Sequence, residues 1–445
     1  MKFMGLCLKN NIIEMPSPQF LGIIPIFQHS NIPIFQYSNM KLVIDRNMPY
    51  AKEAFSTLGE VLARDGRALT VADVRDADAL FTRSTTRISA ALLAGSAVRF
   101  YGSAVIGTDH IDIPYLESRH IPWVGAPGCN AESVANYVTS ALLWLGAQHG
   151  FLLKGKTIGI IGCGNVGSKV LHHAKALGLH ILVSDPPRER EEGCGRREKI
   201  PFVSLEKLLA ESDIVTCHVP LTKTGPDATY QMLNTDQFAQ MKPGVIFINA
   251  ARGAILSTDA LLAVLGTRIA HAVIDCWEGE PTYRTDLLAR VDIATPHIAG
   301  HSYEGKVNGT KIVYKAYLAW LAQAAGDPAC RERAAELLRE ENIEKLFALP
   351  APPVPHIDLS QIKDTDELLR QAVLRVYDIE ADSLRLKRSC VEDPAARAAA
   401  FDQQRSKYPM RREFTSTTIT LKKPTQKLLT TLQGLGFKTE VLETT

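Results

Sequence analysis

The sequence lacks closely paired cysteines, a strong excess of either charge, and any long uninterrupted apolar run. Without C-x-x-C pairs, the eight cysteines predict reduced, mostly buried thiols of a cytoplasmic protein, not a disulfide framework, and we expect no metal. The formal net charge of +2 gives no reason to propose nucleic acid or an acidic membrane as partner. With 46% hydrophobic and 22% charged residues over 445 positions, the composition predicts a soluble globular protein of two or three domains.

The first 39 residues differ from the rest. They contain a tandem repeat in which residues 24–31 (IPIFQHSN) are followed by residues 32–39 (IPIFQYSN). Prolines interrupt the apolar stretch, so neither a signal peptide nor a membrane helix is expected. The segment is either a targeting or partner-binding tail or an unstructured extension. We expect the extension, with the working protein beginning at Met40.

From Met40 onward, short β-branched runs alternate with helical stretches, a pattern typical of parallel sheets covered by helices. The strands predicted for a first sheet are 42–44, 79–82, 100–103 and 123–125. Those predicted for a second sheet are 157–161, 181–184, 214–217, 245–249, 272–274 and 293–295. Six buried strands match a doubly wound nucleotide-binding sheet.

This order predicts an α/β protein with two doubly wound parallel-sheet domains and a small α+β C-terminal domain. Helices are expected at 131–145 and 305–323, the second returning the chain to the first domain. A proline-rich linker at 349–355 precedes the strand and helix signals at 417–422 and 425–435. The predicted domains are 40–137 completed by 302–328 (substrate binding), 138–301 (nucleotide binding) and 329–445 (C-terminal).

A glycine fingerprint follows the predicted strand 157–161 and opens a helix. Gly162 permits a tight turn, Gly164 lets the backbone approach a pyrophosphate, and Gly167 allows close strand–helix packing. The pyrophosphate would bind the N–H groups at the helix N-terminus. The fingerprint therefore predicts a bound dinucleotide.

Asp185 lies at the end of the next predicted strand and bears on the choice of cofactor. A carboxylate there accepts hydrogen bonds from ribose hydroxyls and repels a 2′-phosphate, which favours NAD over NADP. Arg188 follows closely and could lie along the adenine side. The alternative for Asp185 is a strand-end cap.

Arg252 follows the predicted strand 245–249, separated from it by the small residues Ala250 and Ala251. An arginine at a strand end can clamp a substrate carboxylate with two parallel hydrogen bonds. The small residues would let a nicotinamide lie close. The alternative is a surface arginine in a turn.

His297 follows the last strand predicted for the second sheet. Oxidation of a 2-hydroxy acid requires a base to take the hydroxyl proton as hydride leaves, and histidine titrates near neutral pH. Glu280 is the expected acidic partner of the ring, although Glu278 is close enough in sequence to compete. Asp275, at the end of its strand, is a candidate contact for the nicotinamide end of the cofactor.

Together these segments resemble the D-isomer-specific 2-hydroxyacid dehydrogenase family. The resemblance covers about residues 40–325 and rests on 107–112, the fingerprint with Asp185, 218–222, 249–253, 275–281 and 297–300. It implies an NAD-dependent oxidoreductase whose catalytic residues are Arg252, Glu280 and His297. The expected cofactor contacts are Gly162, Gly164, Asn165, Val166, Gly167, Asp185, Val219, Ala250, Ala251, Asp275 and Gly300.

Segments 126–131, 185–187 and 408–414 resemble one branch of that family. That branch acts on a phosphorylated hydroxy acid and carries a C-terminal dimerisation domain, so the resemblance implies a homodimer. The expected substrate contacts are Arg83, Ser84, Val105 and His301. Val105 and His301 depart from the branch, where threonine and tyrosine are expected; a backbone contact could survive the first change, and a histidine could still donate a hydrogen bond.

Two alternatives remain open. The chain could act on phosphoglycerate or another D-2-hydroxy acid. It could also be a non-catalytic NAD-sensing scaffold, which intact catalytic residues do not exclude.

Overall fold

The computed structural model describes residues 40–192, 200 and 202–442, and the predicted N-terminal extension lies outside them. The chain divides into two compact units. Among the described residues, the first comprises 40–127 and Gly309–Phe347, and the second comprises those within Gly128–Asn308 and within 348–442. The division falls inside helix α12 (Tyr303–Ala324). The three-domain boundaries inferred from the sequence remain a prediction.

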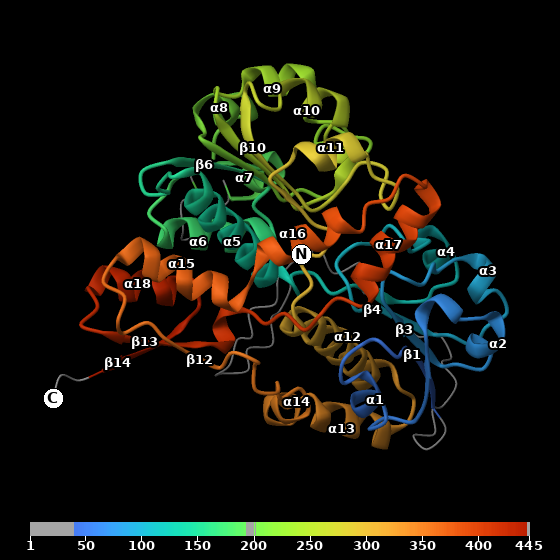
Figure 1. Ribbon diagram of the computed structural model, residues 1–445. Coiled ribbons are helices and arrows are strands. Elements are labelled where there is room, and N and C mark those ends of the chain that lie inside the picture. The colour runs from blue at the N-terminus through green and yellow to red at the C-terminus, as the bar shows by residue number, and fades with distance from the viewer. Residues whose placement is uncertain (1–39, 193–199, 201, 443–445) are drawn as a thin grey trace, which may run out of the picture. The chain divides into compact units, whose positions relative to one another are not determined.

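The first unit is built on a five-stranded parallel sheet with the order β2-β1-β3-β4-β5. Figure 1 labels β1, β3 and β4 of this sheet. Its strands are β1 (Lys41–Asp45), β2 (Glu60–Arg64), β3 (Ala79–Thr82), β4 (Phe100–Ser103) and β5 (Trp123–Val124). Its short helices are α1 (Ala51–Phe55), α2 (Val71–Val74), α3 (Ala90–Leu93), α4 (Ile113–Ser118), α13 (Pro328–Leu337) and α14 (Glu340–Leu346). Four of these strands were predicted, and β2 was not, because its residues are only partly buried at the sheet edge.

The part of α12 that belongs to the first unit packs its aromatic side chains on this sheet. Tyr317 contacts Phe81 edge to face at 5.1 Å between ring centroids, and Phe81 stacks on Phe55 at 4.0 Å. Tyr314 also meets Phe55 edge to face. Such pairs add to the burial of their large apolar area. The helix thus carries the chain back to the first sheet.

The second unit contains a six-stranded parallel sheet with the order β11-β10-β9-β8-β6-β7. Its strands are β6 (Thr157–Ile161), β7 (His180–Ser184), β8 (Ile214–Cys217), β9 (Val245–Asn249), β10 (Ile269–Ile274) and β11 (Ile293–Ala294). Phe202 forms a single parallel bridge to Val183 at the outer side of β7, where a third strand of the doubly wound order 3-2-1-4-5-6 would lie. The predicted fold class is confirmed, and the strand order reverses between β6 and β8.

Helices surround the second sheet (Figure 1). They are α5 (Ala131–His149), α6 (Asn165–Ala176), α7 (Pro186–Glu192), α8 (Leu205–Glu211), α9 (Thr235–Gln240), α10 (Thr258–Val264) and α11 (Thr285–Arg290). In the part of the chain that the structure describes, no helix is both long and apolar enough to cross a membrane.

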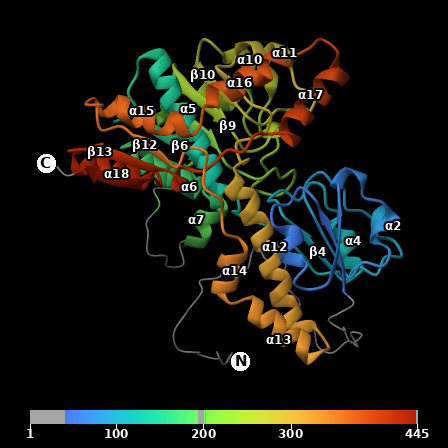
Figure 2. The ribbon, with the colours of Figure 1, turned by 60° about the horizontal axis from the view of Figure 1, so that its bottom comes forward.

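The C-terminal module contains a three-stranded parallel sheet, β12-β13-β14, and packs on α5 and α6 within the second unit. Figures 1 and 2 show α15 beside α5 and α18 beside α6. The elements are β12 (His356–Asp358), α15 (Thr365–Val376), α16 (Ile379–Arg388), α17 (Pro394–Ser406), β13 (Thr418–Lys422), α18 (Gln426–Gly434) and β14 (Lys438–Leu442). Phe414 stacks on Phe437 at 4.8 Å and on His173 of α6 at 6.3 Å, so one apolar core continues from the helices into the module.

A buried polar strip ties the module to α5 and to the start of α12. The guanidinium of Arg412 donates to Glu304 at 2.6 Å, and both side chains are about 95% buried (5% and 6% exposed). The carboxylate of Glu413 accepts hydrogen bonds from the hydroxyls of Ser133 and Ser302 at 2.9 and 2.8 Å. Burial, aided by the negative charge of Glu304, raises the pKa of Glu413 to about 7.

This shift predicts a pH-dependent cost of folding at Glu413. The folded carboxyl holds its proton more tightly than the unfolded one, so its penalty is absent below pH 4.5 and grows until the pH passes about 7. At pH 8 we expect Glu413→Gln to have a higher melting temperature than the native chain, with a gain in unfolding free energy of at most about 3 kcal/mol. At pH 4.5 the variant should have no such advantage.

Thermal unfolding followed by circular dichroism at both pH values measures the difference. Glu211→Gln, at an exposed position of α8, is the matched control and should show no pH-dependent gain. An equal gain for Glu413→Gln at both pH values would contradict the raised pKa.

Candidate active site

The three fingerprint glycines each meet a different local requirement. Gly162 has φ +86°, and a Cβ there would come within 2.7 Å of Val219. A Cβ on Gly167 would lie 2.0 Å from the carbonyl oxygen of Gly162, so the loop and α6 pack too tightly for a side chain. A Cβ on Gly164, in contrast, would point into open space, with no neighbouring atom within 4 Å. The open space at Gly164, directly before Asn165 begins α6, is where a pyrophosphate could approach the backbone.

Asp185 joins the fingerprint loop to the start of α7. One of its carboxylate oxygens accepts the backbone N–H of Cys163 at 2.7 Å, and the other accepts that of Arg188 at 3.1 Å. The capping role considered from the sequence is therefore present. Each carboxylate oxygen can accept a further bond, so this cap is compatible with the predicted ribose contact. The Arg188 side chain donates to Ser168 at 2.7 Å.

The loop that carries Arg252 is fixed by Asn249, the last residue of β9, which is fully buried. Its amide nitrogen donates to the carbonyls of Arg252 and Cys276 at 3.0 and 3.2 Å, and its amide oxygen accepts the N–H of Ala251 at 3.1 Å. Arg252 is half-buried, and its guanidinium donates to the Ala251 carbonyl at 2.8 Å. One side chain thus joins the loop after β9 to the loop after β10.

These two loops also pack backbone against backbone. A Cβ on Gly253 would lie 2.0 Å from the carbonyl carbon and oxygen of Trp277. Only glycine fits there without a shift of the main chain. The turn that follows Trp277 carries Glu280, so this contact sets the position of the Arg252 loop against the Glu280 turn.

His297 and Glu280 form a close pair. The Nδ1 atom of His297 lies 2.5 Å from Oε1 of Glu280, and each side chain is 25% exposed. The other oxygen of Glu280 accepts the backbone N–H of Trp277 at 3.0 Å. Burial opposes ionisation of Glu280, but the charge and hydrogen bond of His297 and the Trp277 N–H outweigh it and hold the pKa of Glu280 below its usual value. Glu280 is therefore an anion suited to stabilising a positive imidazole.

Glu278, the alternative partner considered from the sequence, contacts other groups. Its carboxylate accepts the backbone N–H of Thr258 at 2.9 Å and the side-chain amide of Gln231 at 3.3 Å. The carboxylate that lies within hydrogen-bond distance of the His297 ring is that of Glu280.

Asp275 holds the segment after β11 in place. Its carboxylate accepts the Thr295 hydroxyl at 2.7 Å and the backbone N–H groups of Ile298 and Ala299 at 2.7 and 3.0 Å. His297 itself has a left-handed φ of +54°, and its N–H donates to the Asp275 carbonyl at 2.8 Å. Complete burial raises the pKa of Asp275 against these stabilising bonds. Its predicted contact with the nicotinamide end stays a prediction.

Sequence reasoning missed three side chains that position this site. The sequence indicated Asn249 only as the end of a predicted strand and as part of segment 249–253. The hydroxyl of Thr295 donates to Asp275 and lies 2.7 Å from the hydroxyl of Tyr137, so it links the two residues. Arg411, from the C-terminal module, donates to the carbonyl of Ala299 and lies 4.3 Å from the ring centroid of Tyr377. Nothing in the sequence signals such long-range contacts, except that residues 408–414 stood out as a motif.

The remaining candidates lie in both units. In the first unit, Arg83 and Ser84 directly follow β3, and the guanidinium of Arg83 donates to the Asn47 carbonyl at 3.5 Å. Val105 is half-buried and accepts, through its carbonyl, the N–H of Ala126. In the second unit, the ring of His301 meets that of Tyr408 edge to face at 5.7 Å. Their assignment to a substrate remains a prediction.

Three further cofactor candidates lie in the second unit. Val166 and Ala250 are partly buried against its main core. Gly300 has no room for a side chain, because a Cβ would lie 2.1 Å from the amide nitrogen of Asn130. Their contacts with a cofactor are likewise predictions.

Comparison with known proteins gives matches over most of the chain. Residues 135–299 match the model of the D-isomer specific 2-hydroxyacid dehydrogenase, NAD binding domain, and residues 348–436 match a domain of unknown function (DUF3410). The erythronate-4-phosphate dehydrogenase of Edwardsiella ictaluri is 42% identical over 402 residues, 90% of this chain and 100% of that protein. That of Proteus mirabilis is 40% identical over 399 residues, 89% of this chain and 98% of that protein.

A solved structure agrees in fold. The NAD-bound 3-phosphoglycerate dehydrogenase of Entamoeba histolytica superposes with a TM-score of 0.54 at 24% identity, covering 64% of this chain and 96% of that one. At this identity the likeness supports the fold alone. The family match to residues 135–299 supports NAD as the cofactor.

The contrast between two glycines gives a test of the dinucleotide site. We expect Gly164→Ala to keep the native melting temperature and to weaken NADH binding, because the added methyl group occupies the open space before α6. Gly167→Ala should instead lower the melting temperature, because its methyl group meets the Gly162 carbonyl at 2.0 Å. Fluorescence titration with NADH and thermal unfolding measure the two effects; unchanged NADH affinity in Gly164→Ala would contradict the assignment.

Proposed function

Because the chain belongs to the D-isomer-specific 2-hydroxyacid dehydrogenase family, together with the erythronate-4-phosphate dehydrogenases, we propose that it oxidises 4-phospho-D-erythronate with NAD. The products would be (R)-3-hydroxy-2-oxo-4-phosphooxybutanoate and NADH. We place this reaction in the biosynthesis of pyridoxal 5′-phosphate (vitamin B6). The observation that carries the proposal is the His297–Glu280 pair beside the Arg252 loop, at the carboxyl ends of adjacent strands.

In the proposed mechanism Arg252 binds the substrate carboxylate through its guanidinium and so orients the C2 carbon. Since Nδ1 of His297 faces Glu280, Nε2 is the nitrogen that takes the hydroxyl proton. Glu280 stabilises the imidazolium that results. In the reverse direction the same imidazolium returns the proton to the 2-oxo group.

The fingerprint loop fits the cofactor that the family binds. NAD, when bound, accepts the hydride at C4 of its nicotinamide. The N–H groups at the start of α6 would hold the pyrophosphate, and Gly164 leaves space for it. Asp185 would accept the ribose hydroxyls, which favours NAD over NADP, while the small side chains of Ala250 and Ala251 would adjoin the nicotinamide.

Arg83 and Ser84 are the proposed contacts for the substrate phosphate. Their position directly after β3 is a carboxyl end of a parallel sheet, where ligands commonly bind. An arginine supplies the paired donors that phosphate oxygens accept. Val105, through its backbone, and His301, through its imidazole, are further proposed substrate contacts.

A homodimer formed through the C-terminal module is part of the proposal. Strand β14 is an edge strand, and Val441 and Leu442 on it are 46% and 42% exposed. An exposed edge with apolar side chains favours pairing with another chain.

Buried reduced thiols such as Cys217 and Cys276 support a cytoplasmic setting.

Replacing the proposed base tests the mechanism. We expect His297→Asn to lower turnover by about 10²–10⁴-fold, because proton transfer is lost, while NADH binds almost as before. Steady-state kinetics and NADH titration provide the two measurements. His180→Asn, at an exposed position of β7, is the matched control and should keep full activity. Near-native turnover of His297→Asn would remove its assignment as base.

Substrate choice is tested by comparing 4-phospho-D-erythronate, 3-phospho-D-glycerate and unphosphorylated D-erythronate. We expect the highest kcat/KM for the first. Arg83→Gln should lower kcat/KM for the two phosphorylated acids more than for D-erythronate. D-erythronate has no phosphate, so it has no phosphate contact to lose. Arg87→Gln, exposed in the same unit, is the control.

The outcomes of this assay separate the alternatives. Faster turnover of 3-phospho-D-glycerate would favour a phosphoglycerate dehydrogenase. NADH binding without turnover of any 2-hydroxy acid would favour the NAD-sensing scaffold. An equal loss on all substrates in Arg83→Gln would contradict a phosphate contact.

A further inference from the structure

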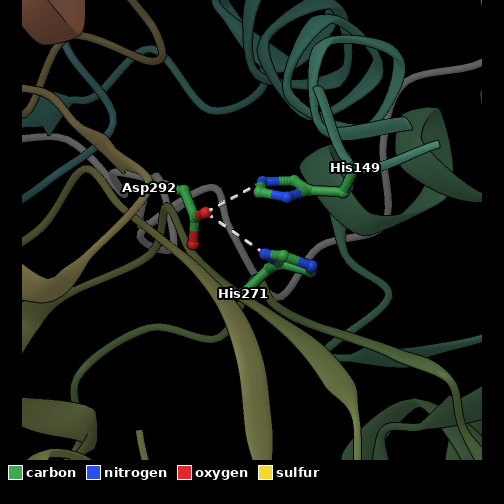
Figure 3. Close-up of side chains that lie close together, drawn as sticks. All are labelled: His149, His271 and Asp292. Carbon is green, nitrogen blue, oxygen red and sulfur yellow. Dashed lines mark hydrogen bonds and ion pairs between the residues drawn. The ribbon is translucent and has the colours of Figure 1, made fainter. Parts of the chain in front are cut away.

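Two histidines and an aspartate from distant parts of the sequence meet in the second unit (Figure 3). His149 is the last residue of α5, His271 lies in β10, and Asp292 directly precedes β11. Their candidate ligand atoms all lie within 4.8 Å of one another. The proposed reaction uses none of these side chains.

The distances suit a tetrahedral transition-metal ion. Nε2 of His149 and Nδ1 of His271 each lie 3.2 Å from the same oxygen, Oδ1 of Asp292. Ligands at the usual zinc–nitrogen distance of about 2.0–2.1 Å would be separated by about 3.3 Å along a tetrahedral edge. The two imidazole rings lie 3.8 Å apart between centroids, so double protonation would bring two positive charges together. One metal ion bound by two neutral rings avoids this repulsion.

The surroundings orient the three ligands. The second oxygen of Asp292 accepts the backbone N–H of Ala272 at 2.9 Å, which leaves Oδ1 facing the histidines. The carbonyl end of α5 carries a partial negative charge, which favours a cation beside His149. His149 is 36% exposed, so an ion can enter from solvent, and a water molecule can complete the coordination.

We propose that His149, His271 and Asp292 bind a Zn²⁺ ion or a similar divalent transition metal. Imidazole and carboxylate ligands favour such ions over Mg²⁺ and Ca²⁺, which prefer oxygen alone. The ion joins the end of α5 to β10 and to the segment before β11. Its role is structural, because His271 and Asp292 lie toward the strand starts, whereas the residues proposed for catalysis follow the strand ends.

A positively charged side chain, that of Lys387, lies near Asp292 and disfavours the binding of a metal cation there. The amine of Lys387, from α16, donates to the carbonyls of Val291 and Asp292 at 2.8 and 3.0 Å. The positive charge of Lys387 partly offsets the negative charge of the Asp292 carboxylate. The same helix accepts the backbone N–H of Ala294 through Ser383 at 3.0 Å. The metal site therefore adjoins the place where the C-terminal module docks on the edge strand.

The test uses the full chain, stripped of metal with a chelator and titrated with ZnCl₂ by calorimetry at pH 7.5. We expect one Zn²⁺ per chain, a rise in melting temperature on binding, and no comparable binding of MgCl₂. His149→Asn and His271→Asn should each weaken Zn²⁺ binding by at least about tenfold. Lys387→Gln should strengthen it, because the opposing charge is removed.

His180→Asn is again the control, since it removes an exposed histidine outside the cluster and should leave the affinity unchanged. Substitution with Co²⁺ gives a second readout, the visible absorption of a four-coordinate ion, which should disappear in His149→Asn. Zn²⁺ binding that is absent, or that is equal in the native chain and His149→Asn, would overturn the site. NADH binding should be the same with and without Zn²⁺, so this result is independent of the proposed reaction.

Discussion

The carboxylate of Asp275 organises the end of the second sheet at which the proposed chemistry occurs. Donors from Thr295, Ile298 and Ala299 converge on it, and these residues lie on both sides of His297 in the sequence. These bonds keep the left-handed backbone of His297 in place, while Glu280 holds its ring. A buried carboxylate is costly unless its hydrogen bonds are satisfied, so the segment and the aspartate stabilise each other.

Backbone packing extends this constraint to the neighbouring strand. Asn249 bonds the loops after β9 and β10 together, and Gly253 lets them touch. The Arg252 loop, the Glu280 turn and the His297 segment therefore form one connected set, although they come from three strands. A substitution at Asn249 would therefore disturb the positions of all three segments, even if its side chain does not touch the substrate.

Most of the strands could be predicted from the sequence, and the features that could not be predicted have physical reasons. Buried strands such as β6 and β9 are continuous apolar runs and were predicted at their observed bounds, whereas the edge strand β2 has mixed residues and was not. The predicted tight turn at Gly162 and close packing at Gly167 are confirmed, because both depend on local backbone geometry, whereas the pyrophosphate contact at Gly164 stays a prediction. Arg411 and the cluster of His149 with its two partners could not be predicted, because long-range contacts bring together residues that no spacing connects.

The contact between Arg411 and the Ala299 carbonyl joins residues 112 positions apart. During synthesis the nucleotide-binding sheet leaves the ribosome well before Arg411 does. The segment carrying His297 thus acquires its last support only after most of the C-terminal module has been made. A nascent chain that does not yet include Arg411 lacks this hydrogen bond, so the segment carrying His297 is held less firmly until that arginine docks on the Ala299 carbonyl.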